Sequence, residues 1–402
     1  MPEDNQAPRS APITEPGHYV IDLTGPRSHT LVTRPGVGSL SIGPPGLGNK
    51  AELHVAPDAV INWPVFEAFA TPAGSPWPRY LRYTGEDAGF LEWAQHRPLE
   101  EATWIPVLAA DTVVDASLSI VHGLHIELGP QPGGFLSLTL PQRPCRLGLS
   151  GDLSRISLSG TLPSSLTLAP HTSRRKSDPP FKLPDLGELH GVTGLTLHSP
   201  PLGQPVSLES LDRFPNLQSL SLWGSFCDLG SLARHTGLTN LELRFMPDLV
   251  ELPGLDSWPL LDRFIAYNVE EAGGKRLRQQ MKARAKARPW DDFASVSKLR
   301  KPEWWMNEYG RPFSAWPKRL AKWANEAYDE AQAAWAEACS LTDAEEVITR
   351  FTMRFNSLKG IETTEREDLG EAVWQISQSV HGLSQPITEE MAQRWFDAAR
   401  HY

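Results

Sequence analysis

One spacing pattern constrains the fold of this chain more than any other feature of its sequence. The pattern apolar-x-x-apolar-x-apolar occurs four times, beginning at Val192, Leu217, Leu238 and Leu261, so successive copies are 25, 21 and 23 residues apart. The last three positions of each copy place two apolar residues on the same face of a β-strand. A period of about 20–29 residues is typical of repeats that each add one strand to a stack. The spacing therefore predicts consecutive strands lying side by side in register.

These copies resemble the repeats of bacterial leucine-rich-repeat proteins. The resemblance covers residues 183–267, about a fifth of the chain. It implies a β-rich solenoid that binds other proteins. The family usually places Asn or Cys three residues after the second strand leucine, whereas this sequence has Pro200, Ser225 and Met246 there. We therefore expect an irregular arc, and with the helical segment described below the expected fold class is α+β.

A shorter rhythm precedes these copies, between residues 118 and 168. Apolar-x-apolar triplets recur about every ten residues, at Leu118–Ile120, Leu124–Ile126, Leu136–Leu138, Leu147–Leu149, Ile156–Leu158 and Leu166–Leu168. Ten residues are few for one complete repeat, so two strands per repeat and a run of hairpins are both compatible with the spacing. Whether this segment belongs to the same solenoid stays open.

The remaining segments have other patterns. Residues 1–16 mix Pro, Ser and charged side chains, which predicts a disordered tail. Residues 17–115 contain short apolar runs between Gly and Pro clusters, which predicts a β-rich N-terminal part with a short helix near residues 89–95. Residues 116–267 then form the repeat solenoid, and residues 268–402 a helical domain with apolar steps of three and four.

Three local signals refine the helical domain. Pro317 is suited to the first position of a long helix. Capping boxes are predicted at residues 342–345 (TDAE) and 364–367 (TERE), and the helix after the second one is expected to bury Leu369, Val373, Ile376 and Val380.

Charge and cysteine content limit the partners and the compartment. The net charge is −10, of which residues 1–267 contribute 18 − 27 = −9 and residues 268–402 contribute 20 − 21 = −1. An acidic first part disfavours nucleic-acid binding and favours a basic protein partner such as a toxin. The sequence has neither an apolar run long enough to span a membrane nor a signal peptide. The odd, widely spaced Cys145, Cys227 and Cys339 fit a reducing compartment, so we expect a cytoplasmic protein without a membrane partner.

The candidate site follows from the strand pattern. The residues beside the strand leucines point to the opposite, concave face of the sheet. That set comprises Gly194, Thr196, His198, Ser219, Ser221, Trp223, Asn240, Glu242, Arg244, Arg263, Ile265 and Tyr267. Trp, Tyr and Arg dominate protein interfaces because they combine a large apolar area with a directed polar group. The predicted partner-binding residues are therefore His198, Trp223, Glu242, Arg244, Arg263 and Tyr267. The alternative is that the C-terminal helices cover this face.

One dense basic stretch lies outside that face, between residues 275 and 288. Its cations are Lys275, Arg276, Arg278, Lys282, Arg284, Lys286 and Arg288. As a helix it would carry charge around most of its circumference, with Leu277 and Met281 as apolar anchors. A solvated connecting helix is favoured over nucleic-acid binding, because no aromatic residue alternates with these cations before Trp290. Pairing with acidic surface of the repeats is a further option.

The candidate motifs for catalysis, cofactor binding and metal binding in this sequence are incomplete. In residues 43–50 (GPPGLGNK) the Lys is displaced and two prolines remove backbone donors that a phosphate loop needs. His122 and His125 are three apart in a strand, so they face opposite sides and cannot share a metal. Cys339 lacks the Cys-x-Asp motif of ubiquitin-ligase effectors that carry leucine-rich repeats and is expected to be buried. The C-terminal carboxylates, including Asp368, are explained as helix-start charges. We expect no catalytic residue, no cofactor and no metal.

The sequence thus predicts a non-catalytic protein-interaction module that binds its partner through the concave face. An immunity protein against a basic toxin, or an adaptor, would fit this description. Two rivals stay open: an enzyme with its active site in the C-terminal helices, and a nucleic-acid binder that uses residues 275–288.

Overall fold

The computed structural model describes residues 11–33, 37–129, 133–314, 316–358, 361, 363–379 and 387–401. The chain forms two compact units, Met1–Leu299 and Arg300–Tyr402. Each unit has its own cluster of buried apolar side chains. The first unit therefore extends 32 residues beyond the predicted boundary at residue 267, to include the basic stretch and one further strand.

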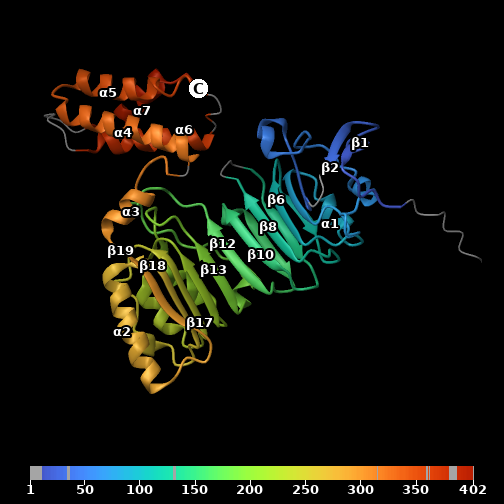
Figure 1. The fold of residues 1–402 in the computed structure, drawn as a ribbon, viewed down its shortest axis with the longest axis horizontal. Coiled ribbons are helices and arrows are strands. Elements are labelled where there is room, and N and C mark those ends of the chain that lie inside the picture. Colours follow the sequence, from blue (N-terminus) through green and yellow to red (C-terminus); the bar gives the residue numbers. More distant parts are fainter. Residues whose placement is uncertain are drawn as a thin grey trace, which may run out of the picture. The chain divides into compact units, whose positions relative to one another are not determined.

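A 12-stranded sheet dominates the first unit (Figure 1). From one end to the other it contains β19 (Ala294–Arg300), β18 (Arg263–Glu270), β17 (Asn240–Met246), β15 (Ser219–Trp223), β13 (Gly194–His198), β12 (Ser165–Pro170), β10 (Arg146–Gly151), β8 (Gly123–Leu128), β6 (Glu101–Pro106), β5 (Tyr80–Gly85), β3 (Ser39–Gly43) and β4 (Leu53–His54). The pairings from β18 to β4 are parallel. Only β3 and β4 depart from the order in which the strands follow one another along the chain.

The strand register is the one that the spacing predicts. Leu195 pairs with Leu220, and Leu220 pairs with Leu241, so equivalent leucines form rows across the sheet. These leucines are buried, whereas the residues between them are half-buried on the other face. Burial of one face holds the register, because a slip by one residue would expose every leucine of a strand.

The ten-residue rhythm alternates between two sheets. Its triplets at residues 124, 147 and 166 lie in β8, β10 and β12 of the large sheet. Those at residues 136 and 156 lie in β9 (Leu136–Leu140) and β11 (Ile156–Gly160), which form a three-stranded parallel sheet with β7 (Thr112–Asp115). The alternative of two strands per repeat is therefore the correct one. The first triplet is an exception, because Leu118 lies in a turn and is 60% exposed.

Short helices and turns close the buried side of the first unit. They are η1 (Pro45–Lys50), η2 (Trp63–Ala68), α1 (Gly89–Trp93), η3 (Leu153–Arg155), η4 (Gly187–Gly191), η5 (Leu208–Arg213), η6 (Leu229–Arg234) and η7 (Leu255–Ser257). Their apolar residues, such as Leu211 and Leu232, join the strand leucines in one continuous core. Two small sheets complete the unit: β1 (Gly17–Ile21) with β2 (His29–Thr33), and β14 (Val206–Ser207) with β16 (Phe226–Cys227).

The predicted fold class is wrong. We expected an α+β, irregular leucine-rich-repeat solenoid, but the molecule belongs to the α/β class: a large parallel sheet with helices, open at β19 and β4 and not closed into a solenoid. The spacing pattern specifies parallel strands in register with one face buried, which many parallel sheets share. It does not specify the connections, and the connections decide the class.

The last two strands of the sheet are joined by the basic stretch. Residues 271–287 form helix α2 (Glu271–Ala287) between β18 and β19. Glu270 caps its first turn by accepting hydrogen bonds from the backbone N–H groups of Ala272 and Gly273. Leu277 is fully buried, and Met281 packs against the core. The predicted helix and its apolar anchors are confirmed.

The second unit consists of helices α3 (Pro302–Tyr309), α4 (Lys318–Glu337), α5 (Leu341–Met353), α6 (Thr363–Ser377) and α7 (Glu389–Ala399). Leu369, Val373 and Ile376 of α6 are buried as predicted, whereas Val380 lies outside the described residues. Alanines and aromatic residues fill this core; Trp335, Phe351 and Phe355 are its largest fully buried members together with Phe313 and Phe396.

Three local predictions about this unit need correction. The capping box of α5 is formed by Ser340 and Asp343, two residues before the predicted one. Pro317 is the N-cap of α4 and not its first helical residue. Cys339 is exposed and not buried, because α4 ends at Glu337 and the chain turns outward before α5.

Two further observations concern the termini and the helices. Ile13, within the predicted tail, forms a β-bridge with Phe69, while residues 1–10 lie outside the described residues. Among the helices that the structure describes, none is both long and apolar enough to cross a bilayer.

Candidate interaction site on the sheet

Four predicted site residues lie side by side on the large sheet. His198 is in register with Trp223, Trp223 with Arg244, and Arg244 with Tyr267, so the row crosses β13, β15, β17 and β18. Each occupies the last outward-facing position of its strand register and is half-buried. Neighbouring parallel strands are about 4.8 Å apart, which brings these large side chains into contact.

The row is an aromatic ladder. The rings of His198 and Trp223 lie 5.1 Å apart at 33°. Trp223 stacks on Phe245 at 5.7 Å and 26°, and Phe245 meets the edge of Tyr267 at 6.0 Å and 72°. Such contacts stabilise ring pairs by about 0.5–1.5 kcal/mol beyond simple burial. The ladder is therefore ordered without a partner.

Phe245 is a site residue that sequence reasoning missed. Strict alternation assigns it to the buried face, because it lies between Arg244 and Met246. Its φ of 51° belongs to the left-handed region, and this conformation turns the side chain to the outer face beside Trp223. The adjacent register positions, Gly224 and Asn268, also have positive φ, at 113° and 52°. Gly224 and Asn268, residue types that favour this region, were the available signal.

An ionic network adjoins the ladder. Glu242 accepts from Arg244 Nε at 3.0 Å and from Arg263 Nε at 3.4 Å. Arg263 also reaches Asp292 at 3.1 Å, and this hydrogen bond raises the pKa of Arg263 above its ordinary value. The Arg244 guanidinium lies 5.2 Å from the Trp223 ring, in cation–π geometry. Glu242 therefore orients both arginines, and the structure brings all six predicted residues into one surface.

Burial sets the charge of the first ring in the ladder. It lowers the pKa of His198 below 6.5, because desolvation disfavours the imidazolium. Burial therefore favours the neutral form of the ring.

Small residues separate this ladder from a second polar group on the same face. Across β10, β12 and β13 the central outward positions carry Gly148, Thr167 and Thr196. Beyond them His125 lies against Gly148, where a Cβ would approach its Nδ1 to 2.3 Å, and its Nε2 bonds Ser150 at 3.0 Å. Further along, Arg82 pairs with Glu127 at 3.2 Å. These groups are partnered within the sheet.

The outer face of the sheet does not carry the acidic excess of the chain. Its strands β5 to β18 contribute Arg82, Arg146, Arg244 and Arg263 against Glu101, Glu127 and Glu242 at outward positions. The excess therefore lies in the loops and on other surfaces. This face carries the aromatic rings and the two arginines that Glu242 orients.

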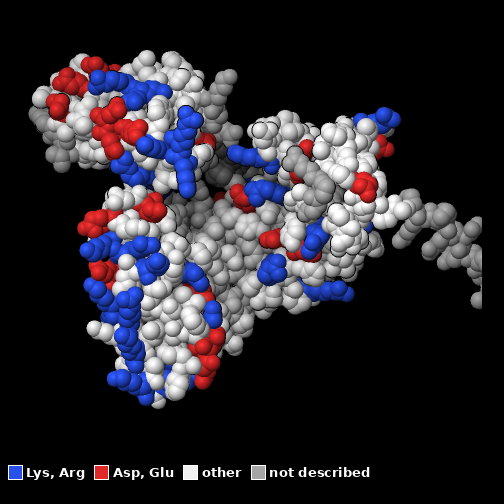
Figure 2. All heavy atoms as spheres, in the orientation of Figure 1, with Lys and Arg blue, Asp and Glu red and all other residues white. Residues whose placement is uncertain are grey.

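Helix α2 displays the densest positive charge, and Figure 2 shows Lys and Arg side chains along it. Several of its arginines are used internally. Arg276 donates to the carbonyl oxygens of Leu249 at 2.7 Å and Leu252 at 3.2 Å. Arg278 donates to Val296, and Arg284 to Leu261, while the Arg284 guanidinium stacks 3.8 Å over Trp290. The arginines thus attach α2 to the sheet, whereas Lys275 and Lys282 remain exposed.

The described residues offer little for catalysis or metal binding. No three His, Cys, Asp or Glu side chains among them are placed to hold a metal ion. Cys227 is half-buried, and burial raises its pKa to about 12, which keeps the thiol protonated. In the helical unit Asp368, which was predicted to be a helix-start charge, lies in the second turn of α6, is 1% exposed and accepts a 2.7 Å hydrogen bond from Trp316 Nε1.

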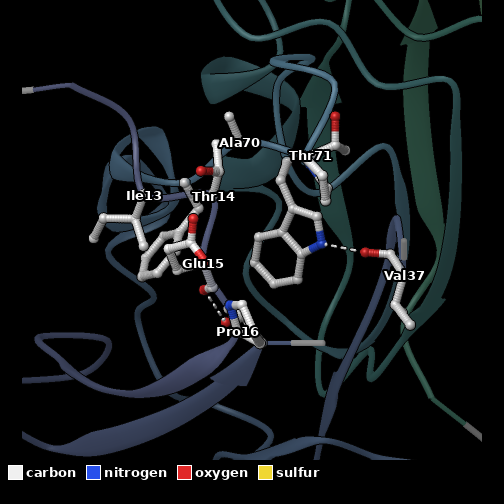
Figure 3. A pocket seen from close by; sticks show the side chains of 11 residues that line it. Ile13, Thr14, Glu15, Pro16, Val37, Ala70 and Thr71 are labelled. Atoms are coloured by element: carbon white, nitrogen blue, oxygen red, sulfur yellow. Dashed lines mark hydrogen bonds between the residues drawn. The ribbon is translucent and has the colours of Figure 1, made fainter. Parts of the chain in front are cut away.

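Two of the hollows formed by the described residues bear on an enzymatic role. The one in Figure 3 is a cavity of about 20 Å³ between residues 13–16 and Trp77, whose Nε1 donates to Val37 at 2.9 Å. It has room for about one water molecule. The other, of about 230 Å³, lies between α4 and α5. Its lining is mostly Ala and apolar residues, and its Arg354 is paired with Glu330. Neither contains a nucleophile beside a base.

No protein-family model matches the chain, and no curated protein or solved structure matches it either. The inferred membership of the leucine-rich-repeat family is therefore wrong, in agreement with the α/β architecture. No relative supports the expected role as an immunity protein.

Proposed function

We propose that the protein is a non-catalytic binding module that recognises another protein through the aromatic ladder, defined as His198, Trp223, Phe245 and Tyr267, together with Arg244, Arg263 and Glu242. The observation that carries this proposal is the register, which sets four large rings and two oriented arginines next to one another on one sheet face. The three free cysteines are compatible with a reducing compartment, and we propose a cytoplasmic location.

The composition and order of this surface support protein binding. Trp, Tyr and Arg are the residue types most enriched among those that carry the binding energy of protein interfaces, and Phe is enriched in interfaces as well. Their mutual contacts limit their freedom before binding, so little side-chain entropy is lost when a partner arrives. The row of positive φ angles at Gly224, Phe245 and Asn268 brings the Phe245 ring to the same face as Trp223 and Tyr267.

The test compares two double variants of the full-length protein in affinity capture from the native organism. Trp223→Ala with Arg244→Glu removes the centre of the ladder. Val113→Ala with Arg234→Glu is the control, because Val113 is 84% exposed on β7 and Arg234 lies on η6. We expect the first variant to bind the partner about 30-fold or more weakly, as for an interface hot spot. The control variant should bind the partner with the affinity of the wild type. Equal recovery of the same partners by both variants would show that another surface binds.

A further inference from the structure

We propose that Arg244 is the receptor for a carboxylate on the partner: a Glu or Asp side chain within an internal segment that crosses the aromatic ladder next to an apolar residue. This inference rests on the proposed function and names the chemistry of the partner.

The Arg244 side chain is held by two contacts and keeps one edge free. Its Nε donates to Glu242 at 3.0 Å, and its guanidinium plane lies over Trp223. Its two terminal nitrogens have no partner within the described part of the chain, and the side chain is 26% exposed. An arginine fixed in this way presents two parallel N–H groups, the geometry that binds a carboxylate through two hydrogen bonds.

The neighbouring polar atoms strengthen this preference. The Trp223 Nε1–H and the Tyr267 hydroxyl have no hydrogen bond to other described residues, and both rings contact Phe245 or Arg244. An indole N–H can only donate, and a tyrosine hydroxyl donates readily. The ladder therefore presents an excess of donors, which a partner must satisfy with acceptors.

Charge favours the same ligand. Glu242 lies between Arg244 and Arg263, and Asp292 pairs with Arg263, so both of these carboxylates are already engaged by arginines. A basic segment would place its charges beside two arginines. An acidic side chain instead completes the coordination of Arg244. Because the rings extend over four strands, an internal segment that crosses them contacts more of the ladder than a chain end does.

The experiment uses a random library of 12-residue peptides displayed in a loop, without a free carboxyl end. The library is selected against the full-length protein, and the best peptide is then synthesised with both ends blocked. We expect the selected peptides to share an Asp or Glu beside an aromatic residue or Leu. Exchange of that acid for its amide should weaken binding about tenfold or more in calorimetric titration, as should Arg244→Gln.

The two changes must be coupled, so that the acid-to-amide exchange costs little further affinity in Arg244→Gln. The control Arg234→Gln should bind like wild type, since Arg234 pairs with Asp212 at 3.0 Å away from the ladder. Thermal unfolding of each variant confirms that it is folded.

Four results would overturn the inference: an empty selection, peptides without a required acid, acid-dependent binding that survives Arg244→Gln, or binding only when phosphoserine replaces the acid. Peptides that bind without an acidic residue but lose binding in Trp223→Ala would be consistent with the proposed function. They would refute only the inference that Arg244 binds a carboxylate of the partner. Peptides indifferent to both Trp223 and Arg244 would refute both.

Discussion

Phe245 has a left-handed backbone conformation that is unfavourable in free energy, and the contacts of its ring with neighbouring rings offset this cost. A left-handed conformation disfavours an L-residue with a side chain by about 1–2 kcal/mol. The contacts with Trp223 and Tyr267 offset a similar amount. An alternation pattern cannot predict the outward position of Phe245, because it assumes extended backbone throughout a strand.

The first prediction concerns this balance. Phe245→Asn should change the free energy of unfolding by no more than about 1 kcal/mol, because Asn tolerates the left-handed region and the lost ring contacts are offset. Leu243→Ala, two residues earlier and fully buried, should cost about 2–5 kcal/mol. Urea unfolding measures both. A loss near 3 kcal/mol in Phe245→Asn would mean that the ring serves the core.

The second prediction concerns pH. Burial lowers the pKa of His125, His190, His198 and His235 below 6.5 in the folded state. Near pH 6 the unfolded chain therefore binds more protons than the folded one, and stability must rise with pH through this window and fall as pH drops below about 6.5.

His198→Asn tests the contribution of the ladder. It should reduce proton uptake on unfolding by at most about one proton and flatten the dependence of the urea midpoint on pH between about 5 and 6.5. The variant His29→Asn, on the β1–β2 sheet, is measured for comparison over the same pH range. An unaltered slope in His198→Asn would show that this ring titrates alike in both states.

At the scale of elements, β15 depends on the turn that follows it. Gly224 has φ of 113°, and a Cβ there would lie 1.7 Å from the carbonyl oxygen of Ser199. The third prediction is that Gly224→Ala destabilises the first unit by about 3 kcal/mol or more, or prevents its folding. The matched change Gly194→Ala meets nothing within 4 Å and should leave stability unchanged or raise it by about 0.5–1 kcal/mol. Chemical denaturation measures the free energy of unfolding of both variants. Equal values for Gly224→Ala and Gly194→Ala would contradict the close approach of residue 224 to Ser199.

The fourth prediction concerns the attachment of α2. Arg276→Gln should lower the free energy of unfolding by about 1–3 kcal/mol, because it leaves the carbonyls of Leu249 and Leu252 without their charged donor. Lys282→Gln, an exposed change on the same helix, should stay within about 0.5 kcal/mol. Differential scanning fluorimetry separates them. Similar melting temperatures would indicate that α2 is the solvated connector that the sequence favoured.

Elements were predictable where a periodic pattern decides them. Alternating leucines identified β13, β15, β17 and β18 together with their register, and charge density with Leu277 identified α2. The N-cap of α5 was predicted two residues too late, because Ser340 and Thr342 are both suitable N-caps and the capping box is formed by Ser340 with Asp343. Cys339 was misplaced for a related reason, since helical periodicity does not show where a helix stops.

At the scale of the whole molecule, two units with separate cores should unfold separately. The fifth prediction is that calorimetry resolves two transitions. Ser340→Ala, which removes the cap of α5, should lower only the transition of residues 300–402, by about 1 kcal/mol. Leu220→Ala should lower only the other, by about 2–5 kcal/mol. A single transition that responds to both variants would show that the units unfold together.

The sequence by itself determined the strands, their register and the face on which His198, Trp223, Glu242, Arg244, Arg263 and Tyr267 lie, because burial of alternate side chains is a local, periodic requirement. Tertiary structure alone decided the α/β class, the second sheet of β7, β9 and β11, and the position of Phe245. The ten-residue rhythm was compatible with a second sheet but also with a run of hairpins, and the structure decided between them. The class and the position of Phe245 depend on how the connections run and on backbone conformations that neighbouring strands impose, which leave no periodic pattern in the chain.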